Sequence, residues 1–408
     1  MNYDQSVQYL YSLGNEVQTA KLGLERITKL LDALGNPHRG MRFIHIAGTN
    51  GKGSTAAMIE SGLRAAGQRT GLYTSPHLSE PTERIRIDFQ PVSRDLFASA
   101  FTTVHDTAER MLQAGELDLH PTYFECVTAL AFLLFRDARL DWVVLEVGLG
   151  GRLDATNVVA PQLCVITPID YDHQMFLGDS IQQIAAEKAG IFKHGIPAVF
   201  AHQRPEAAAV LETMAGGPFL SADQWPIADL EIDAHASRFR IGDLKVVCPL
   251  AGEHQVENAR TAALALRQLG FPTSGIAATR WPGRLERVSD HPEIILDGAH
   301  NIAGAQALAN HIRRFYRERK IWLVYGVMRD KAVGEMTSLL FPLVSRIILT
   351  APDNSRAMPP ERIPAPGAVV THSVSAALDA IRHASAEDAV FITGSLFVVG
   401  EARQHLVQ

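Results

Sequence analysis

Short runs of apolar residues recur along the chain and alternate with segments in which apolar residues follow a helical period. The apolar runs occupy residues 43–47, 69–73, 142–147, 163–167 and 196–200. The helical segments occupy residues 6–34, 56–66, 94–114, 122–136 and 181–189. A strand that is apolar on both faces is typical of a parallel sheet covered by helices. The alternation therefore predicts an α/β fold with a mostly parallel sheet.

The pattern changes near residue 232 and later starts again. Short β runs around the turn Ile241-Gly242-Asp243 span residues 232–250, and a helix is expected over 256–269. Trp281-Pro282-Gly283 is expected to be a linker. Beyond it, strands are predicted at 294–296, 322–325, 347–350 and 390–393, and helices at 304–316 and 375–383. We expect an N-terminal domain over residues 1–280, a linker over 281–285 and a smaller Rossmann-like α/β domain over 286–408.

Composition excludes several classes of protein. The 408 residues are 47% hydrophobic and 20% charged, which is ordinary for a globular chain. The net charge of −6 and the lack of a basic tract argue against nucleic acid as a partner. The longest apolar run, 127–135, is too short to cross a bilayer, and the N-terminus lacks a basic signal region. The dispersed Cys126, Cys164 and Cys248 read as buried thiols in a reducing cytosol, so we expect a cytoplasmic protein without a membrane partner.

A glycine-rich turn, Gly48-Thr49-Asn50-Gly51-Lys52-Gly53-Ser54, links the first apolar run to a helical segment. This order lets backbone N–H groups, a lysine and a hydroxyl cradle phosphates. The strict P-loop pattern differs, because Ile46 stands where it has its first glycine and Gly53 follows the lysine. The favoured interpretation of residues 48–54 is a nucleotide-binding loop of P-loop type, the phosphate loop. A turn with an exposed lysine is the alternative.

Polar side chains also follow two of the later apolar runs. Glu146 lies near the end of one run, and a buried acid is costly unless it is paired or bound to metal. His173 follows Asp170 and Asp172 after what we expect to be the neighbouring strand. A carboxylate and an imidazole from adjacent strand ends could share a hard cation with phosphate oxygens. A salt-bridged acid and an ordinary loop histidine are the alternatives.

The second domain repeats the order of strand, glycine turn and polar group in Asp297-Gly298-Ala299-His300-Asn301. Asn301 has a second interpretation, as the cap of the next helix. Asn258 and Arg284 flank the domain junction, and each is unremarkable by itself.

Further motifs accompany these. They are Thr74-Ser75-Pro76-His77-Leu78, Thr122-Tyr123-Phe124-Glu125, Glu146-Val147-Gly148-Leu149-Gly150-Gly151-Arg152-Leu153-Asp154-Ala155-Thr156-Asn157, Asp172-His173, Glu187-Lys188-Ala189-Gly190-Ile191 and Gly394-Ser395-Leu396. Together with the glycine-rich turn and the motif at 297–301, they resemble bacterial folylpolyglutamate synthase, often bifunctional as dihydrofolate synthase, within the Mur ligase superfamily. The resemblance covers residues 23–400, nearly the whole chain.

The resemblance implies a P-loop-type, Mur ligase-like first domain and a set of site residues. ATP would contact Thr49, Asn50, Gly51, Lys52, Gly53, Ser54, Asn258, Arg284 and Asp297. The metal ligands would be Ser75, Glu146, His173 and Lys188, the last as a carbamate. The pterin site would involve Lys21, Leu22, Thr122, Tyr123, Phe124, Glu125, Leu153, Asp154 and Ala155. Lys52, His173, Lys188 and His300 would act in catalysis. From the residues alone, Lys188 reads instead as a partner in a salt bridge with Glu187 or Asp172.

The activity implied is that of a monomeric, ATP- and Mg²⁺-dependent amide ligase. Two Mg²⁺ ions are expected, and K⁺ is a further candidate ion. The ligase would add L-glutamate to dihydropteroate and to reduced folates through an acyl phosphate. A monofunctional folylpolyglutamate synthase is one alternative, and the atypical loop 79–82 leaves substrate preference open. A Mur-type ligase for a cell-wall precursor is disfavoured, because only about 40 residues precede the phosphate loop. A nucleotide-binding switch without ligase chemistry is the last alternative.

Overall fold

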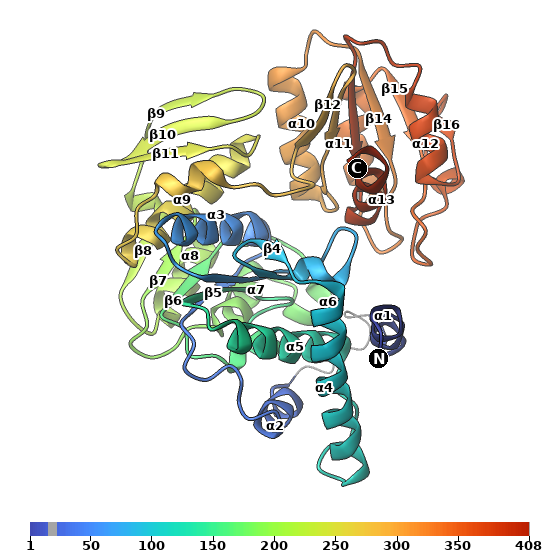
Figure 1. The fold of residues 1–408 in the computed structure, drawn as a ribbon. Coiled ribbons are helices and arrows are strands. Elements are labelled where there is room, and N and C mark those ends of the chain that lie inside the picture. Colours follow the sequence, from blue (N-terminus) through green and yellow to red (C-terminus); the bar gives the residue numbers. More distant parts are fainter. Residues whose placement is uncertain (15–22, 408) are drawn as a thin grey trace. The chain divides into compact units, whose positions relative to one another are not determined.

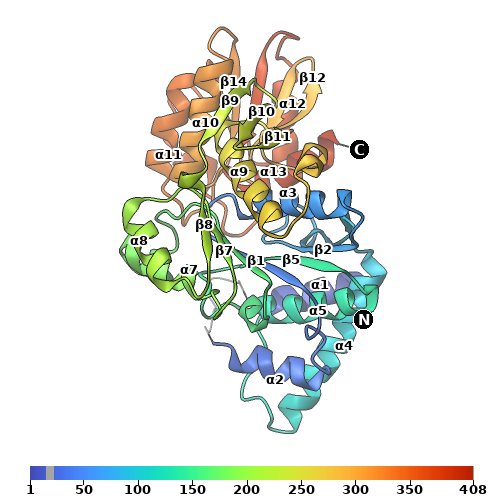
Figure 2. The same cartoon turned by 90° about the vertical axis from the view of Figure 1, so that its left-hand side faces the viewer.

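The computed structural model describes residues 1–14 and 23–407, and its fold is shown in Figures 1 and 2. The chain divides into two compact units. Unit 1 comprises Met1–Ile227, Ile241–Val246 and Glu257–Ile276, and unit 2 comprises Ala228–Arg240, Val247–Val256 and Ala277–Gln408. The domain limits expected from the sequence, 1–280 and 286–408 with a linker at 281–285, stay predictions.

Unit 1 is built on an eight-stranded sheet of order β4-β3-β2-β5-β1-β6-β7-β8. Its strands are β1 (Phe43–Ala47), β2 (Thr70–Tyr73), β3 (Ile85–Ile87), β4 (Gln90–Pro91), β5 (Trp142–Glu146), β6 (Leu163–Ile166), β7 (Ala198–Phe200) and β8 (Phe219–Ser221). Neighbouring strands pair in parallel along β2-β5-β1-β6-β7-β8. At the edge beside β2, strands β3 and β4 are added in antiparallel pairing. Every residue of β1, β2, β5 and β6 is buried, as expected for a sheet covered on both faces.

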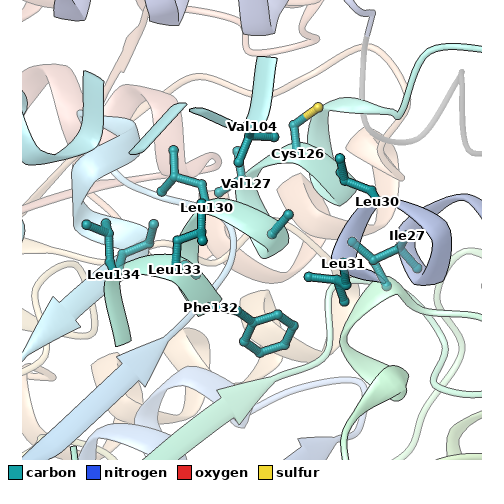
Figure 3. Close-up of a cluster of buried hydrophobic side chains, with 14 of the residues drawn as sticks. Ile27, Leu30, Leu31, Val104, Cys126, Val127, Leu130, Phe132, Leu133 and Leu134 are labelled. Atoms are coloured by element: carbon teal, nitrogen blue, oxygen red, sulfur yellow. The ribbon is translucent and has the colours of Figure 1, made fainter. Parts of the chain in front are cut away.

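Helices cover both faces of this sheet. They are α1 (Tyr3–Ser12), α2 (Glu25–Ala33), α3 (Lys52–Ala65), α4 (Arg94–Gln113), α5 (Tyr123–Ala138), α6 (Gln174–Leu177), α7 (Ile181–Ala189) and α8 (Pro205–Met214). One face packs against α5, and Figure 3 shows α2 side chains such as Leu31 meeting α5 side chains such as Phe132. The same face continues against α7 and α8. In the described part of the segment predicted to be helical, 6–34, the structure has two helices, α1 and α2, and α2 ends before Gly35 and Asn36 as expected.

A three-stranded sheet, β11-β10-β9, and helix α9 (Glu253–Gln268) contain residues of both units. Its strands are β9 (Ile227–Ile232), β10 (Ser237–Ile241) and β11 (Leu244–Cys248), so the turn predicted at Gly242 is confirmed.

Unit 2 carries a six-stranded sheet of order β12-β13-β17-β14-β15-β16. The strands are β12 (Glu286–Asp290), β13 (Glu293–Leu296), β14 (Ile321–Tyr325), β15 (Arg346–Leu349), β16 (Val369–Val370) and β17 (Ala389–Thr393). Helices α10 (Ile302–Phe315) and α11 (Val333–Leu340) pack on one face, and α12 (Val374–Ile381) and α13 (Leu396–Leu406) pair with each other beside β15 and β17. The predicted Rossmann-like α/β alternation is confirmed, except that the edge strand β12 is antiparallel. The sequence pattern did not predict β4, β8, β12, β16, α6, α8, α11 or α13.

Candidate functional site

The phosphate loop and three of the predicted metal ligands lie at the carboxyl ends of four neighbouring strands of unit 1. In the order β2-β5-β1-β6, Ser75 follows β2, Glu146 ends β5, the phosphate loop follows β1 and His173 comes after β6. Ligands of open α/β sheets bind at this edge. The expectation that Glu146 and His173 come from adjacent strands was wrong, because β1 lies between β5 and β6. The strand that leads into the phosphate loop, β1, therefore lies between the strand of Glu146 and the strand that precedes His173.

The phosphate loop is shaped by two glycines. Gly51 has φ +84° and directly precedes α3, so the loop turns into the helix without a side-chain cap. A Cβ placed on Gly51 would lie 2.2 Å from the Asn258 Oδ1 atom. A Cβ placed on Gly48 would lie 1.9 Å from Thr167 Oγ1. Only glycine allows these close approaches, which bring Asn258, predicted to contact ATP, against the loop.

The segment after β6 holds the phosphate loop from the other side. The backbone N–H of Thr49 donates to the Pro168 carbonyl at 3.0 Å, and the Thr49 hydroxyl donates to the Asp170 carbonyl at 3.0 Å. The buried amide of Gln203 in turn accepts from the N–H of Ile169 at 3.0 Å and donates to the Thr167 carbonyl at 3.1 Å. These contacts couple the loop to the segment that leads to His173.

Two lysines converge on the carbonyl of Gly48. Lys52 Nζ donates to it at 3.1 Å and to the Thr49 carbonyl at 3.1 Å, and Lys188 Nζ donates to the Gly48 carbonyl at 2.8 Å. The pKa of Lys188 is lowered to about 7, first by burial and then by the Lys52 charge, whereas Asp172 and Asp154 act in the opposite direction. The phosphate loop thus carries two amines on one carbonyl oxygen.

Lys188 does not use Glu187 as its salt-bridge partner. Glu187 Oε1 instead pairs with Arg152 Nε at 3.2 Å. The interpretation of Lys188 as a partner of Glu187 is therefore wrong, since the neighbouring side chain on α7 points to another cation.

Glu146 and Ser75, both predicted metal ligands, are brought together. The buried Glu146 Oε2 accepts from the Ser75 N–H at 3.1 Å. His173 has φ +49° and directly precedes α6, with its Nε2 3.8 Å from Asp172 Oδ2. Among residues 1–14 and 23–407, no group of three or more His, Cys, Asp and Glu side chains is placed to hold a metal. The Glu146 carboxylate and the Ser75 hydroxyl offer oxygen ligands of the kind that Mg²⁺ prefers, and the assignment of these two residues and His173 to one ion stays a prediction.

The two segments predicted to bind pterin meet at one glycine. Phe124 on α5 would lie 2.5 Å from a Cβ placed on Gly148, so the ring packs on the loop that contains 153–155. Thr122 and Glu125 form a capping box, and Glu125 also pairs with Arg26 at 3.1 Å. Leu153 is exposed, while Tyr123 and Ala155 are buried. The predicted Lys21 and Leu22 lie outside the described residues.

Asp154 stabilises the loop at residues 148–157, the glycine loop. Its buried carboxylate accepts from the backbone N–H groups of Gly148, Leu149 and Thr156 and from the Thr156 hydroxyl. Burial raises the pKa of Asp154 and these hydrogen bonds oppose the rise. The contacts seen are structural, and a direct contact of Asp154 with substrate stays a prediction.

In unit 2, Arg284, Asp297 and His300 lie around the turn after β13. Asp297 accepts from the N–H groups of Leu285 and Ala299, each at 3.0 Å. Arg284 and His300 both hydrogen-bond the Gly298 carbonyl, at 3.4 and 2.8 Å. Burial raises the pKa of Asp297, and Arg284 opposes the rise. Asn301 caps α10 by accepting from the Gly304 N–H at 2.8 Å, which confirms the cap interpretation.

A cavity of about 360 Å³ lies at the other edge of the large sheet. It is lined by residues before β1 and β6 and by one side of α2, which are Leu24, Thr28, Leu31, Asn36, His38, Arg39, Gly40, Met41, Phe43, Val158 and Ala160. None of the predicted site residues within the described part of the chain lines it.

The sequence reading assigned no role to Arg152, Asn157 or Gln203. The first two stood inside a quoted motif, so the signal was available, but their contacts are to segments far along the chain. Gln203 had no sequence signal. The three cysteines are buried and free, as expected. No helix within the described ranges is long and apolar enough to cross a membrane.

Comparison with known families gives two matches. Residues 46–266 match the Mur ligase middle domain, and residues 283–396 match the Mur ligase glutamate ligase domain. The first match contains the phosphate loop and the second contains the motif at 297–301.

Individual relatives are similar along almost the entire chain. Folylpolyglutamate synthase of Lacticaseibacillus casei is 36% identical, with 100% of this chain and 99% of the relative covered. Dihydrofolate synthase/folylpolyglutamate synthase of Bacillus subtilis is 35% identical, with 95% of each covered. The solved structure of Escherichia coli FolC in complex with DHPP and ADP has a TM-score of 0.88 and 32% identity, with 99% of this chain and 97% of that chain covered.

Proposed function

The chain belongs to the Mur ligase family as an ATP-dependent ligase, and we propose that it adds L-glutamate to dihydropteroate and to reduced folates. The observation that carries the proposal is similarity along the full length to relatives named for both synthase activities. The arrangement of unit 1 supports it, because a phosphate loop, a buried carboxylate and two lysines gather at one sheet edge.

The proposed reaction proceeds in two steps. The substrate carboxylate oxygen attacks the γ-phosphorus of ATP, and the bond to the β,γ-bridging oxygen breaks to release ADP. The amine of L-glutamate then attacks the acyl carbon, an amide forms, and inorganic phosphate leaves while the amine loses its proton. Positioning and charge compensation are the main demands on the protein in such phosphoryl transfers. Lys52 and the N–H groups at the start of α3 meet these demands.

We assign Ser75, Glu146 and His173 as ligands for Mg²⁺, with Lys188 as a fourth after carbamylation. When bound, Mg²⁺ would supply positive charge that compensates the phosphate oxygens. The oxygen-rich set suits this ion, and the ammonium form of Lys188 does not. A second Mg²⁺, K⁺, a monomeric state and a cytoplasmic location are parts of the same proposal that rest on family resemblance alone.

We place the pterin beside Phe124 and Leu153, on the loop that also contains the buried Ala155. Support comes from the packing of Phe124 on Gly148, which joins the two segments, and from the exposure of Leu153. Asp154 would act by shaping the loop. The roles predicted for Asn258, Arg284, Asp297 and His300 in ATP binding and catalysis belong to this proposal as well.

A monofunctional folylpolyglutamate synthase is the second candidate, because the L. casei relative carries that name alone. The deciding experiment is a phosphate-release assay with ATP, L-glutamate and either dihydropteroate or a tetrahydrofolate. Glutamate-dependent release with both acceptors supports the bifunctional enzyme, and release with the folate alone supports the second candidate. Release with neither acceptor would refute the proposed function.

A further inference from the structure

The motifs at residues 146–157 and 187–191 are about 35 residues apart in the sequence, and their backbones pack closely against each other. A Cβ placed on Gly151 would lie 2.7 Å from the Lys188 carbonyl oxygen. A Cβ placed on Gly190 would lie 2.4 Å from Arg152 Cβ and 2.5 Å from Arg152 Cα. Gly190 has φ −58°, so only the close approach requires glycine there. The loop at 148–157 is therefore pressed against the last turn of α7, which carries Lys188.

Arg152 binds the end of α7 in three ways. Its backbone N–H donates to the Glu187 carbonyl at 2.9 Å, its Nη2 donates to the Ala186 carbonyl at 3.2 Å, and its Nε pairs with Glu187 Oε1 at 3.2 Å. Carbonyls in the last turn of a helix lack partners within the helix and favour a cation. Arg152 supplies both a donor and a charge from outside the helix.

Asn157 closes the junction with a fully used side-chain amide. Its Nδ2 donates to the Arg152 carbonyl at 2.9 Å and to the Gly190 carbonyl at 3.0 Å. Its Oδ1 accepts from Lys193 Nζ at 2.8 Å. One buried amide thus joins the glycine loop, the end of α7 and the segment that follows it.

We propose that Arg152 and Asn157 are positioning residues that hold the end of α7 so that Lys188 reaches the phosphate loop. The Lys188 amine lies 2.8 Å from the Gly48 carbonyl, and its place along the helix depends on where the last turn of α7 is held. A shift of about 1 Å in a reacting constellation can lower a rate by about 100-fold. This inference rests on the proposed function, in which Lys188 acts at the phosphate loop.

The tests separate the loss of polar contacts at the junction from a change in the spacing of the two backbones. Asn157→Asp keeps the shape of the side chain and the acceptor for Lys193 but removes both donors. Arg152→Gln removes the ion pair with Glu187. Gly190→Ala keeps every polar group and inserts a methyl into the junction. For each, we expect kcat to fall by about 10- to 100-fold, with the KM for ATP and for L-glutamate changed less than about 3-fold. The ¹³C carbamate signal after incubation with labelled bicarbonate should fall as well, per mole of folded protein.

Arg42→Gln is a matched control. Arg42 has a 47% exposed side chain, pairs with Asp141 and donates to a backbone carbonyl. Arg152 is similar, because its side chain is 46% exposed and makes the same kinds of contact. Arg42 lies just before β1, at the opposite edge of the sheet, so its variant should keep kcat and the carbamate signal.

The outcomes distinguish this inference from the proposed function. Wild-type kcat and carbamate signal in folded Asn157→Asp and Arg152→Gln, with Lys188→Ala inactive, would overturn the positioning role alone. Full activity of Lys188→Ala would overturn the role of Lys188 and the positioning role with it. If Asn157→Asp does not fold, Arg152→Gln decides, because its half-exposed side chain is removable without a buried gap.

Discussion

Lys52 and Lys188 donate to the same oxygen, the carbonyl of Gly48, at 3.1 and 2.8 Å. Lys52 is the first residue of α3 and Lys188 lies near the end of α7, 136 positions later. Two cations at such close range repel each other unless one of them changes its charge. This relationship makes the charge state of Lys188 the central question about the site.

Lys188 is expected to be a carbamate in the active enzyme. A carbamate reverses the charge of the side chain and gives Mg²⁺ an oxygen ligand, which an ammonium cannot do. Lys188→Ala should then be nearly inactive, and acetate or formate should restore part of the rate by occupying the gap. The measurement is a ¹³C carbonyl signal that appears with labelled bicarbonate and is absent in the variant. An unmodified ammonium in an active, metal-loaded crystal would contradict the prediction.

Lys52→Ala is expected to lower turnover by about 100-fold or more while the fold is kept, since a lost electrostatic donor at a reacting oxyanion costs this much. The side chain is only partly buried and contacts backbone carbonyls of its own loop. Turnover and melting temperature should be measured on the same preparation. Lys29→Ala is the control, because Lys29 also donates to one backbone carbonyl, of Glu116, outside the site. Wild-type turnover in Lys52→Ala would remove the loop from the mechanism.

Glu146→Gln and His173→Ala are each expected to abolish Mg²⁺-dependent activity. Glu146 ends β5 and His173 follows β6, on either side of the strand that leads into the phosphate loop. Rates should be measured over a Mg²⁺ titration, with His202→Ala as a control for an exposed histidine. If excess Mg²⁺ brings both variants to the wild-type rate, the ligand assignment is wrong.

Dihydropteroate and a monoglutamyl folate are expected to compete for one site. The segments at 122–125 and 153–155 meet through Phe124 and Gly148, and the sequence contains each motif once. Each substrate should act as a competitive inhibitor of the other in phosphate-release kinetics. Activity with both but without mutual inhibition would require two sites.

Unit 2 is expected to lose stability as the pH falls from 6.5 towards 4. The pKa of His254 and that of His311 are each lowered to about 4, mainly by burial. Arg284 adds to the lowering for His254. For His311, His254 and His235 add to the lowering and Glu293 opposes it. Between these pH values the unfolded chain binds protons that the folded chain does not, so acid favours unfolding, by roughly 1 kcal/mol per pH unit for each histidine.

Thermal unfolding from pH 7 to 4.5 tests this expectation. His311→Gln should flatten the pH dependence, since the residue no longer takes up a proton on unfolding. His372→Gln, whose side chain is 77% exposed, is the control and should leave the slope unchanged. An unaltered slope in His311→Gln would show that another group causes the acid sensitivity.

Local sequence patterns determined most strands, most helices and the phosphate loop. Apolar runs such as 142–147 and the turn at Gly51 depend on neighbours within a few residues, so period and composition are enough to identify them. The cap at Asn301 is equally local. The full set of motifs also determined the family, which comparison then confirmed.

Only the tertiary structure decided which segments meet. β1 lies between β5 and β6, Lys188 reaches Gly48, and Asn157 joins the glycine loop to the end of α7. These contacts join residues separated by tens to more than a hundred positions. Strand order and crossover packing are set by how buried faces fit in three dimensions, and no local period in the sequence records that fit.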